Sequence, residues 1–246
     1  MKHGVESLHA TRLEDTRWSE LNMQIINCTK CPRLVEWRLK AALNPPRRYK
    51  GEKYWAKPLL GFGDRKAKLI IVGLAPAAHG GNRTGRMFTG DPSGNTLMRA
   101  LYELGIASKP TSTSRDDGLE IRGAYITAVV RCAPPQNRPT AEERRNCLPY
   151  LMAELSLLKE LRAAVALGKI AYDGLYAALR LLGYSVPKPK PKFRHGQTYT
   201  VAKQGRNLLV AASYHPSRQN TQTGRLTHEM LVDVLRGACL YAELCT

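Results

Sequence analysis

The sequence predicts an α/β fold, a three-layer α/β/α sandwich with a central four-stranded parallel sheet. Four short runs are continuously apolar, as strands covered on both faces should be. Segments with helical character lie between and after them, and this strand–helix alternation is typical of the class. The predicted strands span residues 68–73, 124–130, 162–168 and 207–213, and the predicted helices span 92–104, 140–160, 169–182 and 226–240.

Each predicted element is bounded by recognisable signals. The first helix follows "GDPSGN", and the second opens on Thr140 with Glu142 and Glu143 in its first turn, which favours a helix N-terminus. Unusual motifs follow all four strands in order: "GLAPAAHGG", "RCAPPQNRP", "GKIAYDG" and "YHPSRQN". Because ligands bind outside the carboxyl ends of the strands in open α/β sheets, we expect the functional site at that edge.

We expect a single domain over residues 1–246, since no repeat or convincing linker divides the chain. Two segments interrupt the α/β plan and are predicted to be basic surface loops. Residues 44–63 are basic and aromatic, whereas residues 185–196, "SVPKPKPKFRHG", are proline-spaced and carry no acid. The second segment is expected to form an extended arm or a protruding turn.

The charge balance predicts a nucleic-acid partner. Lys and Arg total 38 against 20 Asp and Glu, a formal net charge of +18. Such an excess favours a polyanion. No apolar run is long enough to cross a bilayer, and the first residues contain no secretory h-region. We therefore expect a cytoplasmic, monomeric protein that binds no membrane.

Six cysteines without an export signal argue against a disulfide framework and favour metal or redox chemistry. Four of them, Cys28, Cys31, Cys132 and Cys147, supply thiolates that suit either zinc or an iron–sulfur cluster. The other two look like a helix-face residue and a tail residue; they are Cys239 and Cys245.

The histidine motif and the glycine-rich loop narrow the chemistry. His215 directly follows an apolar strand and is accompanied by a polar loop that begins at Ser217. The absence of G-x-S-x-G and H-E-x-x-H disfavours acyl transfer and zinc-dependent hydrolysis. The loop after residue 73 matches neither the P-loop nor the dinucleotide fingerprint, so its glycines serve another purpose.

Taken together, "GLAPAAHGGNRTGRMFTGD", "VRCAPPQNRPT", "YHPSRQNTQTGRLT" and the four spaced cysteines closely resemble the family 5 uracil-DNA glycosylases. These form the iron–sulfur branch of the uracil-DNA glycosylase superfamily in archaea and bacteria. The resemblance runs from about Cys28 to the final helix. It implies hydrolytic excision of uracil from DNA in a prokaryotic cytoplasm, with a structural [4Fe-4S] cluster on Cys28, Cys31, Cys132 and Cys147.

The resemblance also implies roles for individual residues. His215 resembles the family histidine that hydrogen-bonds uracil O2 and stabilises the departing anion. Asp91 resembles the residue proposed to hold the attacking water, although it also suits a helix N-cap before Pro92. Phe88 resembles the ring on which the base stacks. Asn137 is either a pocket amide or a turn residue.

The glycine-rich loop lets backbone approach a nucleotide that has been flipped out of the duplex. The predicted substrate-binding residues are Gly73, Ala75, Ala77, His79, Gly80, Phe88, Asn137 and Ser217. The alanines leave room for a larger base, so activity on deaminated purines such as hypoxanthine is expected. Ser93 and Ser217 are expected to contact phosphates. The alternative is a non-catalytic or covalently trapping uracil-DNA-binding protein of the same superfamily.

Overall fold

The computed structural model describes the backbone of residues 2–245 and the side chains of residues 13–245. Six strands form one sheet in the order β1-β3-β2-β4-β6-β5. The four middle strands are parallel: β3 (Ala124–Ala128), β2 (Leu69–Gly73), β4 (Ala163–Leu167) and β6 (Arg206–Ser213). The predicted central parallel sheet is therefore confirmed. Two antiparallel edge strands extend it, β1 (Phe62–Gly63) and β5 (Thr198–Lys203).

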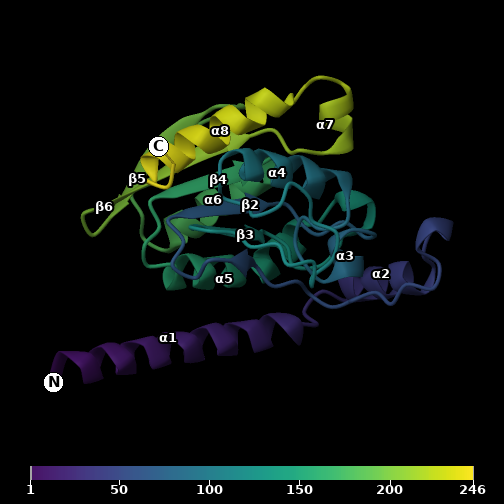
Figure 1. Ribbon diagram of the computed structural model, residues 1–246, viewed down its shortest axis with the longest axis horizontal. Helices are drawn as coiled ribbons and strands as arrows, with labels where there is room; N and C mark the ends of the chain where they lie inside the picture. The colour runs from purple at the N-terminus through teal and green to yellow at the C-terminus, as the bar shows by residue number, and fades with distance from the viewer. Residues whose placement is uncertain (1, 246) are drawn as a thin grey trace.

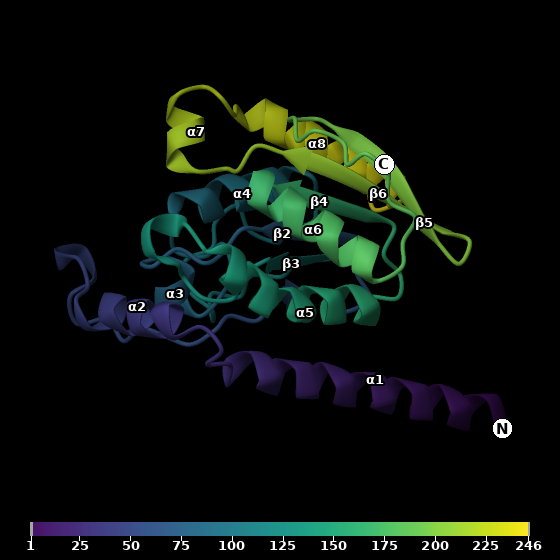
Figure 2. The ribbon, with the colours of Figure 1, turned by 180° about the vertical axis from the view of Figure 1, so that it is seen from behind.

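Helices cover both faces of the sheet (Figures 1 and 2). One face carries α4 (Pro92–Glu103) and α8 (His228–Tyr241), and the other carries α5 (Ala141–Leu157) and α6 (Lys169–Leu181). The long helix α1 (Lys2–Ile26) packs outside α5. The remaining helices are α2 (Pro32–Leu43) and the short η1 (Arg47–Tyr49), α3 (Gly81–Thr84), η2 (Pro135–Asn137) and α7 (Arg218–Gln222).

The apolar core lies in two layers, one on each side of the sheet. Ile70 and Val72 of β2 pack with residues of α5 and α6, whereas Leu69 and Ile71 pack with residues of α4 and α8. Successive side chains of a strand point to opposite faces, and here both faces are covered. This is why the strand reads as a continuous apolar run, and the predicted three layers are confirmed.

The sequence left two alternatives open for the proline-spaced segment 185–196, an extended arm or a protruding turn. The structure shows an extended segment that is anchored to the body of the protein. It lies against α6, because the Tyr176 hydroxyl donates to the Pro187 carbonyl at 2.8 Å and the Tyr172 hydroxyl donates to the Pro191 carbonyl at 2.9 Å. The segment starts beside Ala202, near the amino end of β6, and ends where Gly196 N–H donates to Ala212 O at 2.8 Å. It therefore spans the sheet from its amino edge to its carboxyl edge.

Cys239 lies on α8 and Cys245 lies in the tail, as predicted, but the expectation of no disulfide was wrong. Cys239 and Cys245 form a disulfide, with their Cα atoms 5.5 Å apart. Helix α8 ends at Tyr241 and Glu243 has a positive φ of 54°, which turns the tail back toward the helix. A six-residue separation can thus place both thiols at bonding distance. Within residues 2–245, no helix has the length and apolar character of a membrane span.

Candidate active site

A cavity of about 200 Å³ opens at the carboxyl edge of the sheet, the end on the right of Figure 1 where α3 and α7 lie. Loops that follow β2, β3 and β6 form its walls, as expected for an open α/β sheet. The lining residues are Leu74, Ala75, Pro76, Ala77, Met87, Phe88, Asp91, Ser93, Asn137, His215 and Ser217. The three strand-end motifs singled out in the sequence thus converge on one cavity.

His215 is held in the cavity wall by its backbone. Its carbonyl accepts hydrogen bonds from Ser217 N–H at 2.7 Å and from the Asn220 side-chain amide at 2.8 Å. Gly168, at the end of β4, leaves space beside it, since an added Cβ would lie 3.2 Å from His215 Cβ. Burial lowers the pKa of His215 to about 4. The imidazole is therefore neutral at neutral pH and keeps one N–H donor.

Asp91 serves two functions at once. It is the N-cap of α4, where its Oδ1 accepts the Gly94 N–H at 3.0 Å, and its carboxylate also lines the cavity. Burial raises the pKa of Asp91, while backbone N–H groups and Arg83 act in the opposite direction. The carboxylate lies against Gly80, where any Cβ would overlap it. Gly80 therefore makes room for Asp91.

Phe88 and Asn137 both adopt left-handed backbone conformations, with φ angles of 49° and 57°. Asparagine enters this region readily, whereas for Phe88 it costs about 1–2 kcal/mol, and such strain clusters at functional sites. The Phe88 ring lies 6.2 Å from the His215 ring at an interplanar angle of 28°. A Cβ at Gly73 would lie 2.6 Å from Phe88 Cζ, so this glycine permits the ring position.

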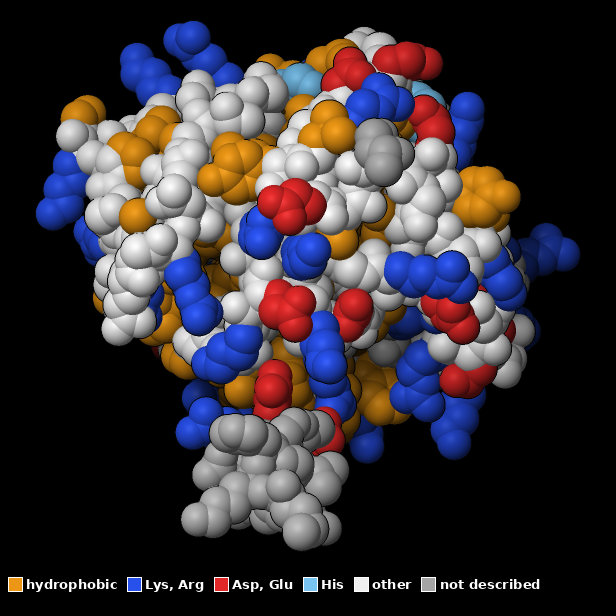
Figure 3. Space-filling model, turned by 60° about the vertical axis from the view of Figure 1, so that its left-hand side comes forward, with side chains coloured by type: hydrophobic (Ala, Val, Ile, Leu, Met, Phe, Trp, Pro, Cys, Tyr) orange, Lys and Arg blue, Asp and Glu red, His pale blue; other side chains and the backbone are white. Residues whose placement is uncertain are grey.

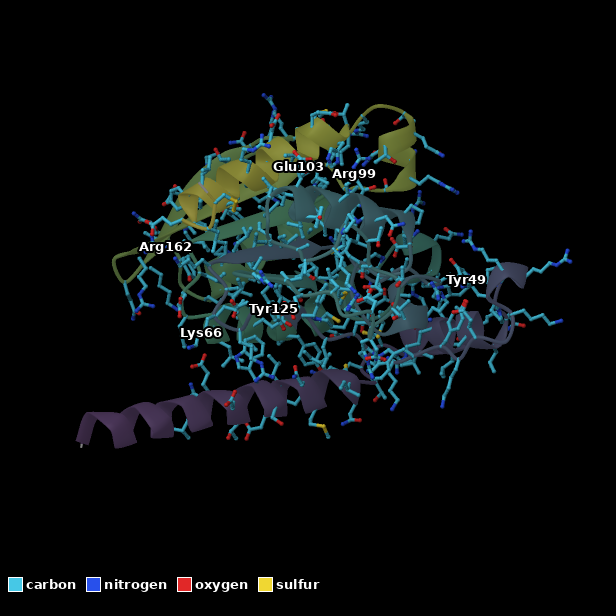
Figure 4. The ribbon with its side chains drawn as sticks, in the orientation of Figure 1. Tyr49, Lys66, Arg99, Glu103, Tyr125 and Arg162 are labelled. Carbon is cyan, nitrogen blue, oxygen red and sulfur yellow. A yellow bond between two sulfur atoms is a disulfide. The ribbon has the colours of Figure 1, made fainter. Side chains whose placement is uncertain are left out.

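His79 is not among the cavity-lining residues. Its Nδ1 hydrogen-bonds the Tyr54 hydroxyl at 3.0 Å, and burial lowers its pKa. Beside it, Arg83 donates to the His79 carbonyl at 2.9 Å, pairs with Glu52 at 2.6 Å, and stacks over Tyr49 at 4.2 Å. Figure 4 shows Tyr49 at this end of the molecule. These contacts fasten the basic loop 44–57 to the glycine-rich loop.

The four remaining cysteines gather on the α5 side of the sheet. Cys132 and Cys147 are buried, and Cys28 and Cys31 pack against the same cluster. Burial raises the pKa of Cys132 to about 11 and that of Cys147 to about 12. No three His, Cys, Asp or Glu side chains in the described part of the chain are arranged to hold a single metal ion.

Most of the predicted site residues meet at the cavity. Ala75, Ala77, Phe88, Asp91, Asn137, His215 and Ser217 line it, and Gly73 and Gly80 stand directly behind Phe88 and Asp91. The structure does not bring His79 into the lining. Leu74, Pro76 and Met87 also line the cavity and were not predicted from the sequence. They lie inside the same motif, and their apolar character alone did not distinguish them from core residues.

The sequence is similar to proteins of one superfamily. The profile of the Uracil DNA glycosylase superfamily matches residues 60–238. A type-5 uracil-DNA glycosylase of Thermus thermophilus is 52% identical over 217 residues, 88% of this chain and 94% of that protein. Its counterpart in Pyrobaculum aerophilum is 50% identical over 215 residues, 87% and 89% of the two chains. A type-4 uracil-DNA glycosylase of P. aerophilum is 32% identical over 199 residues, 80% and 82%.

Proposed function

We propose how the residues of the cavity act, and the proposal proceeds from the family of the protein. The chain belongs to the uracil DNA glycosylase superfamily and, within it, to the type-5 uracil-DNA glycosylases. It is a DNA N-glycosylase, a hydrolase that breaks the bond between uracil and deoxyribose in DNA. One observation carries the proposal for the site. A histidine, a carboxylate, an aromatic ring and an amide converge on one cavity at the carboxyl edge of the sheet.

The cavity suits a base that has been flipped out of the duplex. Phe88 provides an aromatic face for stacking, and the Asn137 amide both donates and accepts hydrogen bonds, as the uracil edge requires. Breaking the glycosidic bond builds negative charge on the base. The neutral His215 donates its N–H to the carbonyl oxygen where that charge develops, an electrostatic role that needs no proton transfer. Its low pKa supports this neutral form.

The sugar carries the opposite charge in the transition state. Asp91 is the one carboxylate among the residues that line the cavity. Its Oδ1 accepts the Gly94 N–H, and the same carboxylate faces the cavity, where it would orient a water molecule toward the sugar and stabilise positive charge there. One side chain therefore combines the helix-cap role and the catalytic role.

The apolar part of the cavity favours a substrate range wider than uracil. Leu74, Ala75, Pro76 and Ala77 present small or flat surfaces where a charged group would restrict the base. We expect the enzyme to accept deaminated purines such as hypoxanthine. Release of uracil alone, with no measurable hypoxanthine, would contradict this expectation.

DNA is held through its phosphates. The net charge of +18 supports an electrostatic contribution to affinity. The loop 44–57 contributes cations that include Arg47 and Arg48 and is fastened beside the cavity through Arg83. Ser93 and Ser217 lie at the first turns of α4 and α7 and line the cavity mouth. Helix N-termini suit phosphate groups.

Four thiolates provide a suitable donor set for an iron–sulfur cluster. Cys28, Cys31, Cys132 and Cys147 would hold it, and it would link α1, α2, β3 and α5 without taking part in base excision. The same thiolates would also suit a zinc ion, so metal analysis of the purified protein distinguishes the two.

The function is tested with a single uracil in a labelled duplex oligonucleotide, followed by alkaline cleavage at abasic sites. We expect cleavage at the uracil position and release of free uracil. Stable retention of the protein on the DNA without uracil release would contradict glycosylase activity and support the trapping alternative. Iron and sulfide analysis of the same preparation tests the cluster separately.

A further inference from the structure

Arg38, on α2, is a buried cation with an unusual partner. Its side chain is only 6% exposed, and its Nη1 donates to Cys132 Sγ at 3.1 Å. Its Nε is buried without a hydrogen-bond partner. Among the residues whose side chains are described, no carboxylate forms an ion pair with it. A guanidinium stays charged at every physiological pH, so this charge needs another source of compensation.

A second buried arginine shows how the fold normally meets this need. Arg131, 1% exposed, lies between the sheet and α5 and pairs with Glu154 through two hydrogen bonds of 2.9 and 2.6 Å. Tyr125 and Thr127 donate to the same carboxylate. Arg131 is thus neutralised by an acid. Arg38 instead faces a sulfur, and a neutral thiol offers a buried cation very little.

We propose that Arg38 is the buried counter-charge of the thiolate-bound cluster, to which it donates a hydrogen bond through Cys132. The proposal rests on the cluster in the proposed function. Four thiolates bound to iron and sulfide form a net anionic group, and hydrogen bonds to its sulfurs, local charge and burial set both its stability and its reduction potential. Arg38 supplies the charge and the donor from within the protein.

The same residue connects the cysteine site to the glycine-rich loop. The Arg38 carbonyl accepts a hydrogen bond from the side-chain amide of Asn82 at 3.1 Å, and Asn82 is fully buried in α3. The Arg38 side chain contacts Cys132, and Cys132 begins the segment that leads to Asn137 in the cavity wall. Charge pairing at Arg38 therefore fixes α2 between two loops of the cavity.

The test uses full-length protein purified without oxygen. Arg38→Met removes the charge and the donors, Arg38→Lys keeps the charge, and Lys40→Gln removes an exposed cation from the same helix as a control. Iron loss to a chelator is followed by visible absorbance, and the midpoint potential is measured by titration with dithionite. Loss of a residue that hydrogen-bonds a metal ligand typically weakens metal binding by about 10- to 100-fold.

Arg38→Met should lose iron to the chelator about 10- to 100-fold more readily than the parent protein. It should also show a lower midpoint potential, because removing a nearby positive charge disfavours reduction. Arg38→Lys should fall between, and Lys40→Gln should match the parent. Equal iron loss and equal potential for Arg38→Met and the parent would overturn the proposal.

Failure of the cluster itself is distinguishable, because the parent protein would then contain no iron. If Arg38→Met does not accumulate as folded protein, Arg38→Lys decides the question. Iron loss or a midpoint potential shifted from the parent values, with Lys40→Gln unshifted, would support the proposal. Parent values of both quantities for Arg38→Lys, or an equal shift in Lys40→Gln, would overturn it.

Discussion

The two edges of the sheet carry cavities of very different character. The cavity at the carboxyl edge measures about 200 Å³, whereas a depression at the amino edge, lined by Lys68, Arg162, Arg206 and Glu243 among others, measures about 610 Å³. In Figure 4, Arg162 and Tyr49 lie at opposite ends of the molecule. Cavity size alone would therefore select the wrong edge.

What differs is how the polar groups are satisfied. At the amino edge, Arg162 pairs with Glu243 at 2.5 Å, and Arg206 donates to the Lys159 carbonyl at 3.3 Å. Figure 3 shows positive and negative side chains interspersed over this side of the molecule. Such exposed pairs contribute little energy and screen one another. At the carboxyl edge, His215 and Asp91 are desolvated and have shifted pKa values, which marks a site adapted for chemistry.

The largest effect is expected for His215→Ala, which removes the donor that faces the developing negative charge. Oxyanion-type donors contribute about 10²–10³-fold, so uracil release under single-turnover conditions should fall by that factor. DNA binding, measured by fluorescence anisotropy, should change little. Arg162→Ala at the amino edge is the matched control and should retain full turnover. Equal losses in both variants would erase the distinction between the edges.

Asp91→Asn should slow the reaction by about 10²-fold, the lower end for acid–base groups, while asparagine preserves the helix cap. Because burial raises the pKa of Asp91, activity of the parent should decline on the acid side at a pH above the ordinary aspartate value. His215 has a pKa of about 4 and is neutral above that pH. The part of the decline that Asp91 causes should be absent from the pH–rate profile of Asp91→Asn. A decline that persists unchanged would assign it to another group.

Gly80→Ala tests whether the position of Asp91 matters as well as its charge. The added Cβ would overlap the carboxylate, and a misplacement of about 1 Å can cost up to about 10²-fold in rate. We expect a loss no larger than that of Asp91→Asn, with DNA binding retained. Gly237→Ala in α8, where an added Cβ meets nothing within 4 Å, is the control and should be active. Full activity of Gly80→Ala would show that Asp91 tolerates displacement.

The sequence predicted the centre of the fold well because buried parallel strands have a strong signature. The continuous apolar runs at 68–73 and 162–168 became β2 and β4 almost to the residue. The edge strands were missed for different reasons. Phe62–Gly63 is too short to show any period. Thr198–Lys203 did carry a sequence signal, because it is followed by Gly205, and glycine suits a tight hairpin turn. In the structure Gln204 and Gly205 both adopt the positive φ of such a turn.

The site was predicted at the level of motifs but not of geometry. Chain order places "GLAPAAHGG" and "YHPSRQN" at the same sheet edge, which is enough to bring Ala75 and His215 together. The position of the Phe88 ring depends on a strained, positive backbone φ, which no local sequence propensity reveals. Likewise, Gly80 resembles a substrate-binding residue in the sequence, and only packing shows that it accommodates Asp91.

A smaller effect separates two lysines of one segment. Lys192 lies near Gly196, at the carboxyl edge, whereas Lys188 is closer to the amino edge. If DNA covers the carboxyl edge, Lys192→Gln should reduce the slope of log K against log salt by about 0.9, the value for one phosphate contact. Lys188→Gln should leave the slope unchanged. Equal changes in both would extend the DNA track along the whole segment.

The smallest effect on activity is expected where the amino edge is covalently fastened. The Cys239–Cys245 disulfide holds the tail that brings Glu243 to Arg162. Because it closes a short loop, the chain-entropy relation gives a stabilisation of about 2 kcal/mol. Cys245→Ser should lower the free energy of unfolding by about that amount, measured by denaturant titration, while uracil release at moderate temperature stays at the parent rate. Reduction of the parent protein should have the same consequence, provided that its iron content is unchanged. If the variant is fully folded and still loses turnover, the amino edge controls the chemistry at the opposite edge. The two edges could then no longer be treated as independent.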